Sequence, residues 1–307
     1  MRLVLDHVVH AVRDAHQARH TFMHQFPLAT SEGGRHEAWG TYNTLAHLGP
    51  VYVEWAAVFD SDLAAGNEFG RWLLYDLARG EGVSQLALRT SALDAVADTW
   101  REAGLPFVGP VRGRRVRPDG LELTWRLLFP AREAGANFPL PFLIEWGPRP
   151  QESIAADSTG STASGQQRNG SHGADQERGN APFADGDLRL TRMHALVQSP
   201  ARTSERLSQY YGPFLPLPER RGEAVVWDVG GVSLCLWPAE SGPRARSAEV
   251  LSTRGERVVA VNLARTASAA SASSGEGGQS LCPSPVEKGH LLHGLWVSIV
   301  PQSASKS

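Results

Sequence analysis

The sequence predicts an α+β fold built from paired βαβββ modules, because one order of elements occurs twice before residue 150. Residues 3–12 alternate in polarity and are rich in β-branched side chains, as in a strand. Residues 14–26 carry apolar side chains at the spacing of one helix face, and Pro27 ends this helix. Strands are then expected at 28–31, 39–48 and 51–58, with turns at Gly33-Gly34 and Gly49-Pro50.

A second stretch repeats this order. A strand is expected at 84–89 and a helix at 92–103, which Gly104 closes. The two stretches also align residue by residue, since Leu5-Asp6-His7-Val8-Val9 lies over Val83-Ser84-Gln85-Leu86-Ala87, and Val53-Glu54-Trp55 over Ile144-Glu145-Trp146. The remaining strands are expected at 107–111, 121–129 and 141–146, with Asp119-Gly120 as a turn.

Length and composition restrict the class of protein. A chain of 307 residues with 41% hydrophobic and 20% charged residues is typical of about two globular domains. The formal net charge of −2 does not favour a nucleic acid or an anionic membrane as partner. Two cysteines exclude a disulfide framework, no stretch is apolar enough to span a bilayer, and Asp6, His7 and His10 interrupt the only signal-like run. We therefore expect a cytoplasmic protein.

The chain divides into three parts. Residues 1–150 are expected to form one domain of two modules, 1–80 and 81–150. Residues 151–185 are rich in Ser, Gly and Gln and predict a disordered linker. Residues 186–302 predict a degenerate third βαβββ-like module, interrupted by a disordered loop at 266–285.

Four polar side chains occupy matched places in the two copies: His7 and Gln85 on the first strands, Glu54 and Glu145 on the last. If first and last strands are neighbours, these side chains converge on one centre. One imidazole, one amide oxygen and two carboxylates suit a divalent metal such as Zn, Mn, Ni, Co or Fe(II). The alternative is that each is an ordinary strand residue facing solvent, although carboxylates within apolar runs are rarely buried without a partner.

The pattern resembles the glyoxalase-like domain branch of the glyoxalase / vicinal oxygen chelate superfamily. The resemblance covers about residues 3–148 and implies paired βαβββ modules, as in glyoxalase, bleomycin-resistance and dihydroxybiphenyl dioxygenase proteins. It also implies a cleft that holds a divalent metal on His7, Glu54, Gln85 and Glu145. The motifs that carry it are Leu5-Asp6-His7-Val8-Val9, Gly33-Gly34-Arg35-His36, Trp39-Gly40-Thr41-Tyr42-Asn43, Arg117-Pro118-Asp119-Gly120, Trp125-Arg126 and Pro141-Phe142-Leu143-Ile144-Glu145-Trp146.

The same resemblance implies roles for further residues. Glu54 or Glu145 would act as general base beside a Lewis-acidic metal. The expected substrate-binding residues are Arg35, His36, Trp39, Asn43, Trp125 and Arg126. The alternative is that these arginines pair with nearby acids and that the tryptophans belong to the core.

The C-terminal part shows weaker signals. His194 aligns with His7, but the strand expected at 232–237 contains no Glu, so we expect no metal there. We interpret this part as a packing or cleft-covering domain, and Cys235 as a core residue.

Three functions remain open from the sequence. The first is a metal-dependent enzyme of lyase, isomerase or dioxygenase type acting on a small substrate with vicinal oxygens. The second is a metal-free module of the same fold that sequesters an aromatic or drug-like molecule. The third is a structural or interaction protein. The expected partner is a small molecule, with a homodimer as candidate assembly.

Overall fold

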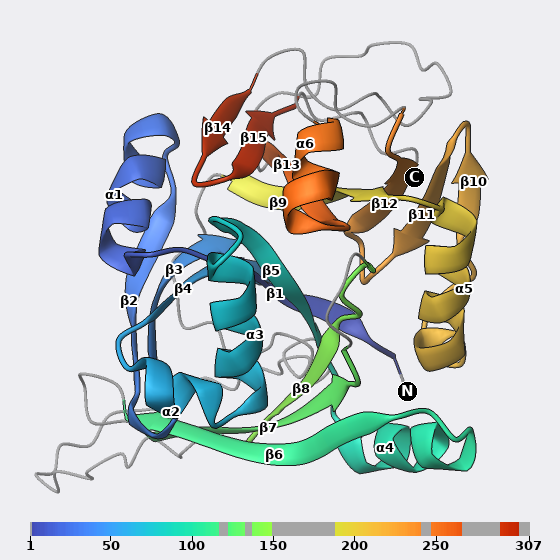
Figure 1. The fold of residues 1–307 in the computed structure, drawn as a ribbon, viewed down its shortest axis with the longest axis horizontal. Helices are drawn as coiled ribbons and strands as arrows, with labels where there is room; N and C mark the ends of the chain where they lie inside the picture. The colour runs from blue at the N-terminus through green and yellow to red at the C-terminus, as the bar shows by residue number, and fades with distance from the viewer. Residues whose placement is uncertain are drawn as a thin grey trace, which may run out of the picture.

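The computed structural model describes residues 2–116, 122–132, 137–148, 188–240, 247–265 and 289–300. The predicted linker at 151–185, the predicted loop at 266–285 and the Asp119-Gly120 turn lie outside these residues. The described strands form two sheets (Figure 1).

The first sheet has eight strands from two βαβββ modules, which confirms the predicted fold class. The first module comprises β1 (Val4–Ala11), α1 (Ala15–Gln25), β2 (Ala29–His36), β3 (Thr41–Leu48) and β4 (Val51–Val58). The second comprises β5 (Gly82–Arg89), α4 (Leu93–Glu102), β6 (Phe107–Val116), β7 (Glu122–Pro130) and β8 (Phe142–Trp146).

The strand order β2-β3-β4-β1-β5-β8-β7-β6 places the two modules back to back. At the centre β1 runs antiparallel to β5, with Val8 opposite Leu86. Each first strand lies parallel to the last strand of its own module, β1 beside β4 and β5 beside β8. The outer strands β2 and β6 also contact each other, so the sheet curls around its concave face.

Three helical elements were not predicted. A 3-10 turn at Glu37–Trp39 precedes β3 within the first module, and α2 (Ser61–Ala65) and α3 (Glu68–Leu77) lie between the modules. Asn67 caps α3 by accepting a hydrogen bond from Gly70 N. Phe69 and Leu73 of α3 join the cluster of side chains on the concave face, including Val9 and Ala87. The helix therefore fills part of the curl and leaves the rest to a cleft.

The second sheet repeats this plan with seven strands in the order β10-β11-β12-β9-β13-β15-β14. β9 and β13 pair antiparallel at its centre, as β1 and β5 do in the first sheet. Its elements are β9 (Leu188–Val197), α5 (Pro200–Tyr211), β10 (Glu219–Arg221), β11 (Ala224–Asp228), β12 (Ser233–Pro238), α6 (Ser247–Arg254), β13 (Arg257–Arg265), β14 (His290–Leu292) and β15 (Leu295–Ile299).

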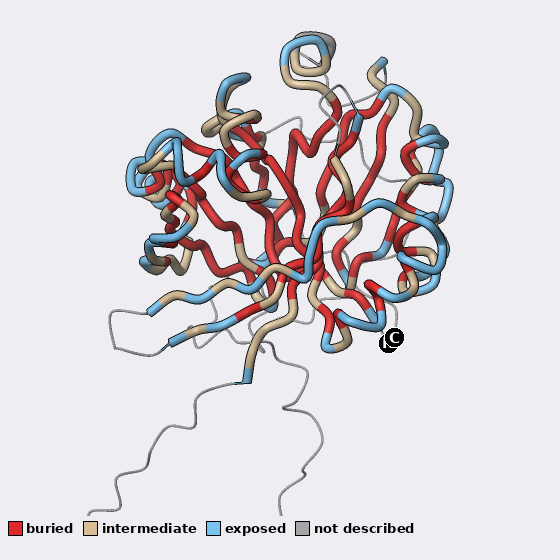
Figure 2. Tube along the Cα trace, turned by 60° about the horizontal axis from the view of Figure 1, so that its bottom comes forward, coloured by how far each residue is buried: buried red, intermediate tan, exposed pale blue. Residues whose placement is uncertain are grey.

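One hydrophobic core joins the two sheets. It contains Trp55 and Trp100 from the first half and Tyr211 and Trp227 from the second. The Trp100 indole Nε1 donates a hydrogen bond to the Tyr210 carbonyl oxygen at 2.7 Å. Figure 2 shows the buried chain gathered in the central strands, with outer loops and helix surfaces exposed. Among the described helices, none is long and apolar enough to cross a membrane.

The predicted turn at Gly33-Gly34 is wrong, since β2 continues through both residues with a bulge between Glu32 and Gly34. These glycines serve close approach instead. A Cβ on Gly33 would lie 1.8 Å from Asn43 Oδ1, and one on Gly34 would lie 3.1 Å from Arg115 Nη1. The side chains of β3 and β6 therefore cross over β2 where it has no side chain of its own.

His194, the counterpart of His7 in the second sheet, is held by two neutral partners. Trp237 Nε1 donates to His194 Nδ1 at 3.0 Å, and His194 Nε2 lies 3.2 Å from Asn262 Oδ1. Burial, with Arg192 nearby, lowers the pKa of His194 from 6.5 to about 3. The imidazole is therefore a neutral core residue.

This burial predicts sensitivity to acid. Between pH 6.5 and about pH 3, His194 binds a proton in the unfolded chain but not in the folded protein. The free energy of unfolding therefore falls as the pH drops through this range. We expect the wild type to lose about 2 kcal/mol more than His194→Gln between pH 7 and pH 5, measured by urea denaturation. His20→Gln, at an exposed site, should behave as the wild type. Equal acid sensitivity in all three proteins would contradict the assignment.

Candidate functional site

A cleft occupies the concave face of the first sheet beside α3. It consists of an inner recess of about 40 Å³ and an outer cavity of about 660 Å³. His36, Trp39, Trp125 and Trp146 line both spaces. Aromatic side chains therefore stand between the recess and the outer cavity.

Strand register decides which predicted residues reach this cleft. Val9 of β1 lies opposite Glu54 of β4 and opposite Gln85 of β5, while His7 lies opposite Tyr52. Directly paired residues share a face of the sheet, as do residues two apart on one strand. His7, Glu54 and Gln85 thus all face the concave side.

His7 is oriented by a buried carboxylate. Its Nδ1 lies 2.8 Å from Asp6 Oδ1, and its ring stacks on Tyr52 with centroids 4.6 Å apart. Trp146 Nε1 donates to Asp6 Oδ2 at 3.2 Å. Burial acts to raise the pKa of Asp6, but the hydrogen bond and charge of His7, together with Arg89, hold it below its usual value. The aspartate is therefore ionised beneath the imidazole.

The other ring nitrogen of His7 points toward Glu54, with Nε2 3.4 Å from Glu54 Oε2. Glu54 is 5% exposed and accepts a hydrogen bond from Asn43 Nδ2. Gln85 is also 5% exposed, and among the described residues its Nε2 has no hydrogen-bond partner. The floor of the inner recess thus holds an imidazole and a carboxylate, His7 and Glu54, while Gln85 lies on the same face of the sheet but lines neither space.

Glu145 does not join them, so the expected convergence of four ligands does not occur. Ile144 and Trp146 line the inner recess, and Glu145 between them lies on the opposite face of β8. Its carboxylate accepts hydrogen bonds from Arg126 Nε at 2.8 Å and from Leu93 N at 3.2 Å. Phe142, opposite Ala87, holds the place in the second module that Glu54 holds opposite Val9.

The predicted substrate-binding residues divide in the same way. His36, Trp39, Asn43 and Trp125 line the inner recess. Arg126 lines the outer cavity together with Glu145, and the hydrogen bonds that it donates to Asp94 and Glu145 raise its pKa. Arg35 lines neither space, since its guanidinium lies 3.6 Å above the Phe59 ring and bonds Glu37.

His36 is a neutral group in the cleft. Burial lowers its pKa to about 4, although Glu54 acts in the other direction. Its Nδ1 lies 3.0 Å from Thr41 Oγ1, and its ring packs edge-on against Trp125. It is therefore placed for hydrogen bonding rather than for binding an anion by charge.

Eight further residues that line the recess were not predicted as site residues: Leu45, Tyr52, Phe69, Arg115, Leu127, Phe142, Ile144 and Trp146. Phe69 lies on α3, whose apolar residues at 69, 73 and 77 have helical spacing that the sequence does contain. Phe142 could not be predicted, because its place in the recess depends on how β5 pairs with β8, and the sequence does not show that register.

The structure brings two of the four predicted metal ligands, His7 and Glu54, within range of one ion. Among the described residues, no group of three or more His, Cys, Asp and Glu side chains gathers at one point. His7 Nε2 and Glu54 Oε2 are nonetheless separated by 3.4 Å, close to the ~3 Å between neighbouring ligands of one ion. Gln85 supplies an amide on the same face, and Asp6 bonds the far nitrogen of His7 as outer-shell carboxylates do.

Comparison with known proteins agrees with the fold. A family model described as a glyoxalase-like domain matches residues 5–211. The chain therefore belongs to the glyoxalase-like domain family. Comparison with curated protein sequences finds no match.

Solved structures extend the likeness to the whole chain. A hypothetical protein from Staphylococcus aureus is 12% identical, with 98% of this chain and 100% of that chain covered and a TM-score of 0.63. Methylmalonyl-CoA epimerase from Mycobacterium tuberculosis is 22% identical over 48% of this chain and 89% of its own, with a TM-score of 0.36. A mutant of 4-hydroxymandelate synthase from Streptomyces coelicolor is 14% identical over 85% of this chain and 71% of its own, with a TM-score of 0.47. The first of these shows that both sheets belong to one recurring fold.

The adjacent glycines of β2 provide a matched test of the site's geometry. Gly33→Ala would place a Cβ 1.8 Å from Asn43 Oδ1 and 2.7 Å from its carbonyl oxygen, so Asn43 must leave Glu54. We expect a loss of about 1–3 kcal/mol in urea denaturation. Gly34→Ala meets only the movable end of Arg115 at 3.1 Å and should cost less. An equal cost at both positions would contradict this packing.

Proposed function

We propose that this protein binds a small, flat aromatic molecule in the cleft of its first sheet. The observation that carries the proposal is the aromatic lining of both spaces, Trp39, Trp125 and Trp146 with His36. An outer cavity of about 660 Å³ has the size of a small-molecule site. Aromatic pairs contribute roughly 0.5–1.5 kcal/mol each beyond the burial of area. The indoles would therefore supply much of the affinity.

The floor of the cleft would orient such a ligand. Glu54 lines the recess and accepts hydrogen bonds, so a ligand with an O–H or N–H on the edge that enters the recess is favoured. Asn43 fixes the Glu54 carboxylate, while Asp6 fixes the His7 ring. A ligand without matching groups would leave these buried polar side chains without hydrogen bonds, so the site would bind it more weakly.

Quenching of tryptophan fluorescence by 1-anilinonaphthalene-8-sulfonate and by a series of catechols and naphthoquinones tests the proposal. We expect saturable quenching that weakens about tenfold in Trp39→Leu, since Trp39 lines both spaces. Trp72→Leu is the control. It leaves as many tryptophans as Trp39→Leu does, but the indole that it removes lines neither space. Absence of saturable binding to the wild type, or equal weakening in both variants, would count against the cleft.

A second candidate is a metal-dependent reaction of lyase or isomerase type on a small substrate with vicinal oxygens. The orientation of His7 by Asp6 and the 3.4 Å between His7 Nε2 and Glu54 Oε2 favour it. His7, Gln85 and Glu54 would hold a divalent metal, which when bound would act as a Lewis acid toward substrate oxygens. Glu54 would also serve as proton acceptor, and the aromatic walls would exclude water. Cytoplasmic location and homodimer formation stay predictions.

Metal content measured by elemental mass spectrometry separates the candidates, after incubation with Zn, Mn, Ni, Co or Fe(II) and desalting. The metal proposal expects about one equivalent in the wild type, loss in Glu54→Gln, and retention in Glu145→Gln, whose carboxylate lies on the other face. Equal loss in both variants would restore the four-ligand site. Failure of every ion to bind would contradict the metal proposal and leave only the aromatic-binding proposal.

A further inference from the structure

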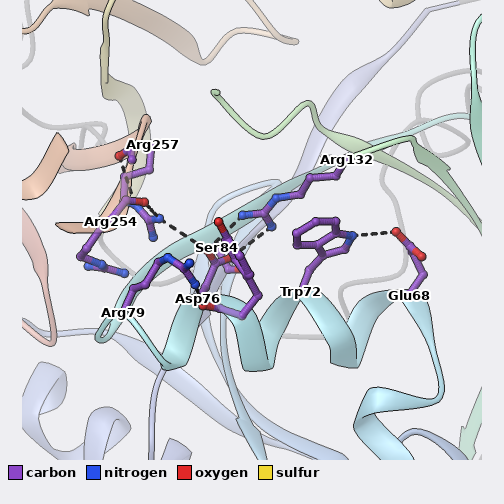
Figure 3. A network of polar contacts seen from close by, with 10 residues as sticks. Glu68, Trp72, Asp76, Arg79, Ser84, Arg132, Arg254 and Arg257 are labelled. Atoms are coloured by element: carbon purple, nitrogen blue, oxygen red, sulfur yellow. Dashed lines mark hydrogen bonds and ion pairs between the residues drawn. The ribbon is translucent and has the colours of Figure 1, made fainter. Parts of the chain in front are cut away.

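The seam between the two halves contains a concentration of buried arginines. Asp76 of α3 is fully buried and accepts a hydrogen bond from Ser84 Oγ at 2.5 Å. Arg132 binds both of its oxygens, Nη1 to Oδ2 at 3.1 Å and Nη2 to Oδ1 at 3.0 Å. Arg257 of β13 reaches the same carboxylate at 3.4 Å and donates a hydrogen bond to the carbonyl oxygen of Arg254 of α6 (Figure 3). Two guanidinium groups thus bind one carboxylate, and that of Arg254 lies within electrostatic range of it.

We propose that Arg254 and Arg257 bind a small oxyanion, a phosphate or a carboxylate, at this seam. The site is separate from the cleft, since neither arginine lines the recess or the outer cavity. It joins α3 of the first half to α6 and β13 of the second.

The unpartnered nitrogens define the chemistry of the ligand. Among the described residues, Nε and Nη2 of Arg254 are both buried without a hydrogen-bond partner, and so is Nη1 of Arg257, a residue only 3% exposed. Nε and Nη2 form one edge of a guanidinium, whose two N–H bonds run parallel. This edge matches two oxygens of a carboxylate or phosphate. Buried donors of this kind need an acceptor, because desolvating them without one costs free energy.

The described carboxylates near Arg254 are already engaged. Glu81 accepts a hydrogen bond from Arg13 N at 2.7 Å and pairs with His293 Nδ1 at 2.8 Å. Asp76 is shared by Arg132 and Arg257. Burial and the charge of Arg257 lower the pKa of Arg254 to about 10, although Asp76 and Glu81 act in the other direction. An added anion would relieve this like-charge contact.

Glycines make the approach to Arg254 possible. Gly80, Gly82 and Gly294 surround its guanidinium and all have positive φ. A Cβ on Gly82 would lie 2.2 Å from Nη1 and 2.7 Å from Nη2, and one on Gly294 would lie 2.8 Å from Nη1. The guanidinium therefore lies flat against backbone, with its orientation fixed by the chain on both sides of the seam.

Inorganic phosphate is the probe, and the line width of its ³¹P NMR signal is measured with increasing protein at constant ionic strength. We expect saturable broadening by the wild type and an affinity at least roughly tenfold lower in Arg254→Lys, which keeps the charge but loses the parallel fork. Arg71→Lys, at an exposed position on α3, should bind phosphate as the wild type does. Circular dichroism on each variant separates loss of the site from loss of the fold.

The outcomes distinguish the proposal from its alternatives. Displacement of phosphate by acetate would support the same site and assign it to carboxylates. No saturable broadening by the wild type, or equal broadening by folded Arg254→Lys, would overturn it. The aromatic-ligand and metal experiments are unaffected by either result, since their variants lie in the cleft.

Discussion

The antiparallel pairing of β1 with β5 is the constraint on which the site depends. With Val8 opposite Leu86, His7 and Gln85 take equivalent places on the concave face. The neighbouring parallel strands then bring Glu54 to this face in the first module and Phe142 in the second. A shift of one residue in either ladder would turn every one of these side chains to the other side of the sheet. The same central pairing recurs between β9 and β13, where the counterpart His194 is enclosed by Trp237 and Asn262.

Much of the fold was predictable because strand and helix periodicity is local. Val51–Val58 was predicted with its observed bounds, and α1 and α4 differ from expectation only at their ends. Glu145 shows where local reasoning fails. The repeated Glu-Trp pair suggested equivalence with Glu54, but equivalence in a sheet is set by register, and Trp146 rather than Glu145 faces the recess. The turn predicted at Gly33-Gly34 was wrong for a related reason, since a glycine permits the close approach of another side chain as well as a turn.

Interior helices give the two sheets different characters. α3 covers part of the first concave face and leaves the cleft, whereas Val250 and Leu251 of α6 pack against the cluster that contains Cys235 and Trp237. Both helices also end near the seam, where Asp76 and Arg254 come within range of one another. The interior packing of each half is therefore linked to the polar contacts that join them.

The replacement of a second carboxylate by Phe142 gives the cleft two unlike ends. In the recess the first module contributes His7 and Glu54, and the second contributes Phe142 and Trp125 together with Arg115. Gene duplication would by itself produce a symmetric container, in which a molecule and its reversed copy fit equally well. Here the symmetry is broken at two strand positions, with Glu54 against Phe142 and His7 against Gln85, so the site can tell the head of a bound molecule from its tail.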